Sequence, residues 1–207
     1  MPGTLWYPVL ILTAILALPV LAVGLLGHRA RRLGALVRWQ SDAISWLSTT
    51  VGVTVAWATL FMVLAQFSVV VMRYVFGFNS IGLQESVIYA HGIMFMLASA
   101  YTLLMGGHVQ VDIFYYKMSD RSKAWVDFAG TFLLLVPVML LILYFSWNYV
   151  ESAWRSMEGS RESSGLPYVY LLKTVILGFA TLMLLQGIAK AGHAALVLAG
   201  HSKEMTP

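Results

Sequence analysis

Residues 43–72, AISWLSTTVGVTVAWATLFMVLAQFSVVVM, decide the fold of this chain. The stretch is mostly apolar and contains no Asp, Glu, Lys or Arg. As an α-helix it would be about 45 Å long at roughly 1.5 Å per residue, whereas the hydrocarbon core of a bilayer is about 30 Å thick. We therefore expect a transmembrane helix that tilts, kinks or projects beyond the bilayer.

Four further stretches around it are long and apolar enough to cross a membrane, at residues 5–26, 84–105, 124–150 and 169–198. The composition agrees, because 59% of the residues are hydrophobic and 11% are charged, with a mean hydropathy of +0.78. A soluble domain has about 25% charged residues. We predict an all-α, multi-pass integral membrane protein, a bundle of about five transmembrane helices, with a kink at Pro137 in the fourth.

Lysine and arginine alternate between the short connections, and positive residues are retained on the cytoplasmic side of a membrane. Arginines cluster after the first span and positive residues recur after the third, whereas the connections after the second and fourth hold fewer. This distribution predicts a periplasmic N-terminus and a cytoplasmic C-terminus. The first span is expected to be retained rather than cleaved as a signal peptide, because no positive charge precedes its apolar core.

The basic connector at residues 29–41 has two interpretations. Its spacing places apolar side chains on one helical face and arginines on another, which is typical of a helix lying on the membrane surface among lipid headgroups. It can equally be an ordinary basic loop that follows the orientation rule.

Several classes of chemistry have no motif in this sequence. The chain has no cysteine, which excludes disulfides, thiolate metal sites and cysteine nucleophiles. Lys173-Thr174 follows two leucines rather than a glycine-rich phosphate loop, and neither an HExxH nor a catalytic GxSxG pattern is present. We therefore predict that the chain is not an enzyme, contains no cofactor of its own and does not bind nucleic acid.

Histidines in transmembrane helices raise the alternative of a haem b-binding membrane anchor of a respiratory oxidoreductase, with His108 and His193 as paired ligands. The other interpretation is that these histidines form hydrogen bonds between helices or reach water. Glu85, Asp127 and Lys173 lie near the ends of their spans, where local ion pairs or snorkelling can satisfy them.

Small residues at four-residue spacing predict close helix packing. The candidate packing positions are Gly52 and Ala56 in the second span and Gly187, Ala191 and Ala195 in the fifth.

Two segments resemble a known family. The first, QESVIYAHGIMFMLASAYTLLMGGHVQVDIFY at residues 84–115, begins with Gln-Glu and ends with Gly-His-Val followed by Val-Asp. The second, ESAWRSMEGSRESSGLPYVYLLK at residues 151–173, has a Ser-rich loop that leads through Gly-Leu-Pro into a helix. Together with RYVF at residues 73–76, they resemble the small membrane subunit of tripartite ATP-independent periplasmic (TRAP) transporters.

The resemblance implies an organisation and a function. Residues 42–198 would form the four-helix domain of the family, preceded by an extra transmembrane helix at 1–28 and followed by a cytoplasmic tail at 199–207. The chain would be a non-catalytic scaffold in the bacterial inner membrane, surrounded by lipids. Its partners would be a large, elevator-type membrane subunit that binds sodium ions, and a periplasmic substrate-binding protein that docks transiently during organic-acid symport. A structural protein without a transport partner is a further alternative.

The resemblance also selects candidate interface or structural residues: Arg73, Glu85, His108, Asp112, Arg155, Glu158, Ser160, Ser164, Gly165, Pro167 and Lys173. For the 151–168 loop, one interpretation is a docking surface that uses Arg155 and Arg161. The other is that its serines cap and order the connection, with Pro167 starting the next helix. For residues 107–112, we expect the glycines to end the helix, and His108 and Asp112 to order the turn.

Overall fold

The computed structural model describes residues 7–27, 33–107 and 118–200, and all the regular structure in these ranges is helical. Five helical segments there are long and apolar enough to cross a membrane, which confirms the predicted fold class. The elements are α1 (Tyr7–Leu26), α2 (Gly34–Tyr74), α3 (Ile81–Leu97) with α4 (Ser99–Leu104), α6 (Asp120–Gly130) with the π-helical turn η2 (Thr131–Leu135) and α7 (Val136–Arg155), and α8 (Val169–Leu198).

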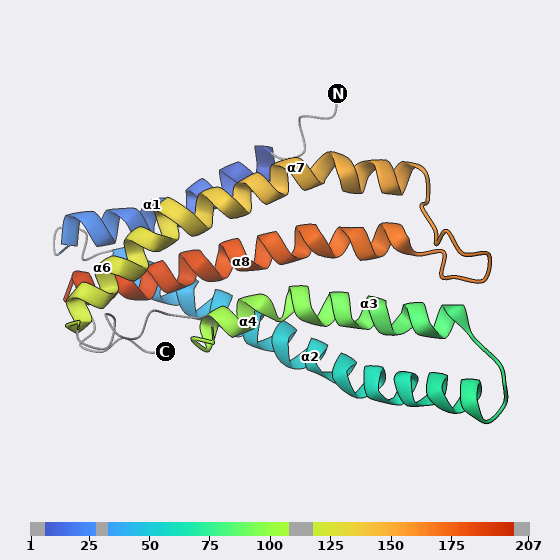
Figure 1. The fold of residues 1–207 in the computed structure, drawn as a ribbon. Helices are drawn as coiled ribbons and strands as arrows, with labels where there is room; N and C mark the ends of the chain where they lie inside the picture. Colours follow the sequence, from blue (N-terminus) through green and yellow to red (C-terminus); the bar gives the residue numbers. More distant parts are fainter. Residues whose placement is uncertain (1–6, 28–32, 108–117, 201–207) are drawn as a thin grey trace.

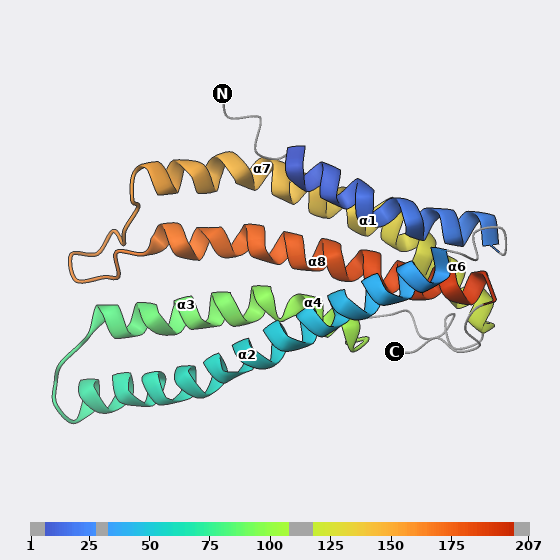
Figure 2. The same ribbon diagram turned by 180° about the vertical axis from the view of Figure 1, so that it is seen from behind.

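Helix α8 runs through the middle of the bundle, with α1 and α7 on one side and α2 and α3 on the other (Figures 1 and 2). It packs against all the other elements described, α1, α2, α3, α4, α6, η2 and α7. We call the end of the bundle with the connections 75–80 and 156–168 the loop end. The opposite end, where α1 and α8 finish and α6 begins, is called the basic end.

Small residues allow these close approaches to α8. Gly187, Ala191 and Ala195 are buried, as the sequence predicted. A Cβ atom added at Gly187 would overlap the side chain of Leu135, and one at Gly192 would overlap the Ser41 hydroxyl. The half of α8 nearest the basic end is therefore the densest part of the core.

Helix α2 begins earlier than the sequence suggested. Residues 34–41 of the predicted basic connector form its first turns rather than a surface helix or a loop. Val37 and Ser41 are buried and face Gly192 of α8, while the Gln40 side-chain amide donates a hydrogen bond of 2.9 Å to the Leu16 carbonyl of α1. The face that carries Val37, Gln40 and Ser41 is thus covered by two helices of the same chain, whereas Leu36 and Trp39 are exposed.

The extra N-terminal helix is an integral part of the bundle. Val20 and Val23 of α1 are fully buried, and Gly24 lies so close to the ring of Phe128 that a Cβ atom would overlap it. Helix α1 therefore packs against α6 and α8 near the basic end and leaves the loop end uncovered (Figure 2).

Two irregularities lie where the sequence predicted them. The π-helical turn η2 ends at Leu135, two residues before Pro137 in the first turn of α7, so the wide turn accommodates the missing proline N–H. At the end of α4, Gly107 donates to the Thr102 carbonyl at 2.9 Å and Gly106 to the Leu103 carbonyl at 3.3 Å. Gly106 has a φ of +67°, so the glycine pair ends the helix as expected.

The contact between Gly52 and Tyr101 provides a test of this packing. A methyl group at Gly52 would overlap Cβ and Cγ of Tyr101, which cannot move without the α4 backbone. We expect Gly52→Ala to destabilise the protein by about 1–3 kcal/mol, as overpacking usually does. Thermal unfolding in detergent, followed by size-exclusion chromatography, measures the effect.

Gly130→Ala is the matched control, because a Cβ atom there meets nothing within 4 Å. Alanine is also preferred over glycine in a helix by about 1 kcal/mol, so this variant should unfold at the same or a higher temperature. Equal melting temperatures for both variants would contradict the assigned α2–α4 contact.

Candidate functional site

Charged side chains gather at the two ends of the bundle. At the basic end, Lys190 of α8 lies 3.1 Å from Asp127 of α6, and His193 lies 4.0 Å from Asp42 of α2. At the loop end, Lys173 of α8 pairs with Glu158. Of the two possibilities that the sequence left open for Asp127 and Lys173, snorkelling and local ion pairs, the structure shows ion pairs.

Glu85 connects the start of α3 to the loop that follows α7. Its carboxylate accepts one hydrogen bond from the Ser160 hydroxyl at 2.5 Å and another from the backbone N–H of Leu166 at 2.6 Å. Ser80 positions this end of α3 because its hydroxyl caps the helix by accepting from the Leu83 N–H. A single carboxylate thus holds two points of a loop that lies 75 and 81 residues away along the chain.

Gly165 makes this arrangement possible. A Cβ atom at this position would lie within 3 Å of both the Ser160 side chain and the Glu85 carboxylate. The backbone N–H of Ser160 also donates to the Leu166 carbonyl at 3.0 Å, which closes the loop upon itself. The loop is therefore ordered by Ser160 and Gly165 together with Glu85.

A second connection joins the same loop to α8. Lys173 Nζ lies 2.6 Å from a carboxylate oxygen of Glu158 and 3.9 Å from the centre of the Tyr149 ring. The Lys173 side chain is only 15% exposed, so its charge is enclosed by an acid and an aromatic face. The backbone N–H of Tyr170 donates to the Glu158 carbonyl at 3.2 Å, which fixes Glu158 from the other side.

The remaining predicted residues of the loop end point outward. Arg73, Arg161 and Ser164 are exposed, and Arg155 pairs with Glu151 one turn earlier on α7, with 72% of its own side chain exposed. The loop end therefore has exposed polar side chains in addition to the connection made by Glu85.

Three predictions have other outcomes. The interpretation in which the loop serines cap and order the connection holds in part, because Ser160 orders the loop through Glu85 and the Glu162 N–H. The N-cap of α8 is Tyr168, which makes no side-chain capping bond, and Pro167 lies two residues before the helix. Ala56 is exposed on α2, whereas Gly52 is buried. His108 and Asp112 lie outside the described residues.

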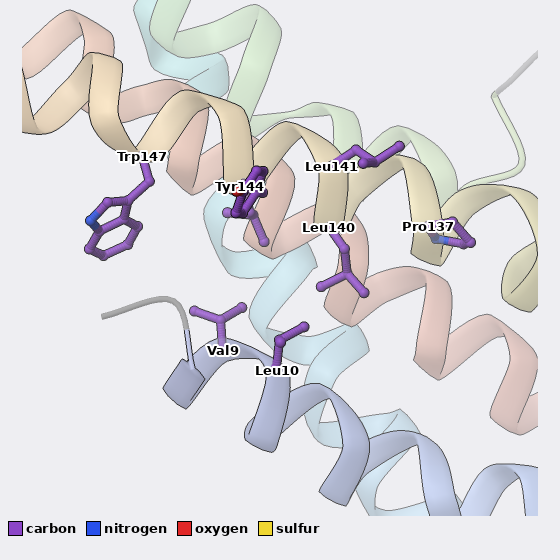
Figure 3. Close-up of a pocket in the computed structure, with 8 residues that line it drawn as sticks. Val9, Leu10, Pro137, Leu140, Leu141, Tyr144 and Trp147 are labelled. Atoms are coloured by element: carbon purple, nitrogen blue, oxygen red, sulfur yellow. The ribbon is translucent and has the colours of Figure 1, made fainter. Parts of the chain in front are cut away.

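An apolar groove of about 380 Å³ lies between α1 and α7 (Figure 3). Val9 and Leu10 of α1 face Leu140, Tyr144 and Trp147 of α7 across it. The described residues that line it include no Asp, Glu, Lys, Arg or His that could orient a charged substrate. Among the described residues, no group of three or more His, Asp or Glu side chains is arranged to hold a metal ion.

The sequence identified Glu85 and Lys173 as candidate residues but did not identify all the groups that they contact. The Leu166 N–H is a backbone group, and nothing in the sequence indicates which carboxylate it binds. The stacking of Lys173 on Tyr149 was also not predicted, although Tyr149 lies near the end of the fourth span and Lys173 near the start of the fifth, both at the loop end. The hydrogen bond of 2.8 Å from the Trp154 indole to the Thr174 hydroxyl likewise depends on how α7 and α8 align.

Substituting Glu85 tests whether it orders the loop. Glu85→Leu has a similar length but no hydrogen-bond acceptor, so both Ser160 and Leu166 lose theirs. We expect the Leu166 amide to exchange with deuterium several-fold faster, as measured by mass spectrometry of the purified protein. Glu162→Gln, an exposed change in the same loop, should leave this exchange unaltered. Equal protection in both variants would show that Glu85 does not hold the loop.

Comparison with known families identifies the chain. The family model described as "Tripartite ATP-independent periplasmic transporters, DctQ component" matches residues 62–195, from the middle of α2 almost to the end of α8. No curated protein and no solved structure matches the chain significantly. The match gives no support to a haem-binding anchor. It covers more than half of the chain and every described loop-end residue discussed above, so this protein belongs to the DctQ component family of TRAP transporters.

Proposed function

We propose that this chain is the non-catalytic small membrane subunit that scaffolds a large, sodium-coupled membrane subunit during uptake of organic acids across the bacterial inner membrane. Family membership supports a transporter component. The distribution of charge within the described bundle carries the scaffold role. The ion pairs of Lys173 and Lys190 lie at the two ends of the bundle, and small residues of α8 fill the core near the basic end. Such a bundle is suited to supporting a partner.

The loop end faces the periplasm in this proposal. The sequence segments that join the spans at the basic end contain Arg29, Arg31, Arg32, Arg38, Lys117, Arg121 and Lys123, whereas those at the loop end contain Arg73, Arg155 and Arg161. Positive residues in short connections favour the cytoplasm, and that preference places the basic end inside. Arg161 of the ordered loop at 156–168 and Arg155 at the end of α7 are then presented to the periplasmic binding protein.

Cysteine labelling tests this orientation directly, because the natural chain has no cysteine. In intact cells with a permeabilised outer membrane, a membrane-impermeant maleimide should label Glu162→Cys at the loop end. The same reagent should label Arg121→Cys at the basic end only after the inner membrane is opened. Both positions are exposed, so labelling in the reverse order would overturn the proposed topology.

Charge reversal tests the docking role. A chain carrying Arg155→Glu and Arg161→Glu should still copurify with a large multispanning subunit in mild detergent, but uptake of radiolabelled organic acids should be slower, because rim charges mainly affect association rates. Arg121→Glu at the opposite end is the control and should leave uptake unchanged. Normal uptake by the double variant would exclude a docking role, and copurification with flavoprotein or iron–sulfur subunits would exclude the transporter scaffold itself.

A further inference from the structure

Polar side chains on the exposed surface of α2 and α3 fall into two groups. The hydroxyls of Thr50, Thr54 and Ser68 each donate to the carbonyl four residues earlier in their own helix, at 2.8–2.9 Å. Ser99 of α4 does the same with Phe95 at 2.8 Å. Such hydroxyls are satisfied within their own helices and can face lipid at little cost.

Gln66 of α2 and His91 of α3 form the second group. Both side chains are exposed, and neither has a hydrogen-bond partner among the residues that the structure describes. The imidazole of His91 only stacks on Phe95, with ring centres 6.1 Å apart. An amide and an imidazole are thus left to find partners outside this part of the chain.

The depth of these two side chains makes lipid an unsuitable neighbour. Gln66 lies seven residues before Arg73, and His91 lies six residues after Glu85, so they are about 10 Å and 9 Å along their helices from those charged residues. Hydrocarbon at that depth offers no hydrogen-bond donor or acceptor. Polar side chains within the membrane therefore usually face protein or a water-filled cavity.

Gln66 and His91 lie on one face of the α2–α3 hairpin. The Thr59 hydroxyl contacts Met94 Sδ at 2.9 Å, and this contact sets the antiparallel register of the two helices. Gln66 follows Thr59 by seven residues and His91 precedes Met94 by three, so each lies on the same side of its helix as that contact. The same register places Gln66 within about 6 Å of the level of His91.

Large apolar side chains surround this polar pair. Val63, Ile88 and Phe95 are 61%, 63% and 67% exposed. The hairpin forms the edge of the bundle farthest from α7 (Figures 1 and 2), so the described helices leave this face uncovered. Polar groups framed by apolar residues are typical of contacts between transmembrane helices.

We propose that the Gln66–His91 face of the α2–α3 hairpin packs against a transmembrane helix of the large membrane subunit, and that this helix presents hydroxyl, amide or carboxylate groups to the two side chains. The inference rests on the proposed function and specifies where the partner binds. A lipid acyl chain cannot supply such groups, whereas a protein helix can.

Photo-crosslinking in the native membrane tests this assignment. A benzoylphenylalanine is introduced at Val63 or at Ile88, which flank the polar pair without replacing it. Phe145 of α7 is the matched control, because it is 71% exposed and lies six residues from Glu151, as His91 lies six residues from Glu85. We expect a crosslinked product that contains the large multispanning subunit from the first two positions and not from Phe145.

A second measurement uses apolar replacements. Gln66→Leu with His91→Leu should reduce the copurified large subunit several-fold, while the melting temperature of the isolated chain stays the same or rises. Gln66→Asn and His91→Gln, which keep polar groups, should retain more of the partner. A full yield of complex with both leucines would overturn the proposed contact.

The outcomes separate this inference from the proposed function. Capture of the large subunit from Phe145 but not from Val63 or Ile88 would overturn the inference and leave the scaffold function intact. Crosslinks only to lipid or to a second copy of this chain at Val63 and Ile88 would also overturn it. Failure to capture a multispanning partner from any position, together with failure to copurify one, would overturn both.

Discussion

The small side chains of α8 allow helices from both sides of the bundle to approach one central helix. Gly187 accommodates Leu135 of the π-helical turn, and Gly192 accommodates Val37 and Ser41 of α2. Dispersion contacts and hydrogen bonds between helices hold helices together in a membrane, where the hydrophobic effect contributes little between them. The positions of α1, α2, α6 and α7 therefore depend on this one surface, and a larger residue on it would displace more than one neighbour.

The loop end is ordered by interactions that use few residues. Glu85 holds Ser160 and Leu166, and Lys173 holds Glu158, so the 156–168 loop is fastened to α3 as well as to α8. Both connections use charged groups at partly enclosed positions, where charge-assisted hydrogen bonds are stronger than in bulk water. The exposed arginines are thus carried on a rigid base, which is what a docking surface requires.

The side of the bundle formed by α1 is covered more completely by this chain than the side formed by the α2–α3 hairpin. At the basic end, α1 closes one side by packing Gly24 on Phe128, although this helix lies outside the part matched by the family. On the other side, the α2–α3 hairpin leaves Gln66 and His91 exposed. The extra helix therefore adds packing within the chain. The part of the hairpin that contains Gln66 and His91 lies within the family-matched region and provides the surface suited to a partner.

Hydropathy in the sequence was sufficient to predict the five membrane-length helices. The proline and the glycine pair were sufficient to predict the irregularity near Pro137 and the end of α4, because these features depend on local backbone chemistry. The motif residues also led to the correct family. The tertiary structure alone decided that residues 34–41 belong to α2, that Ala56 is exposed while Gly52 is buried, and that Glu85 binds the Leu166 N–H. These features depend on how helices distant in the sequence align, and the spacing of residues along one helix does not specify that alignment.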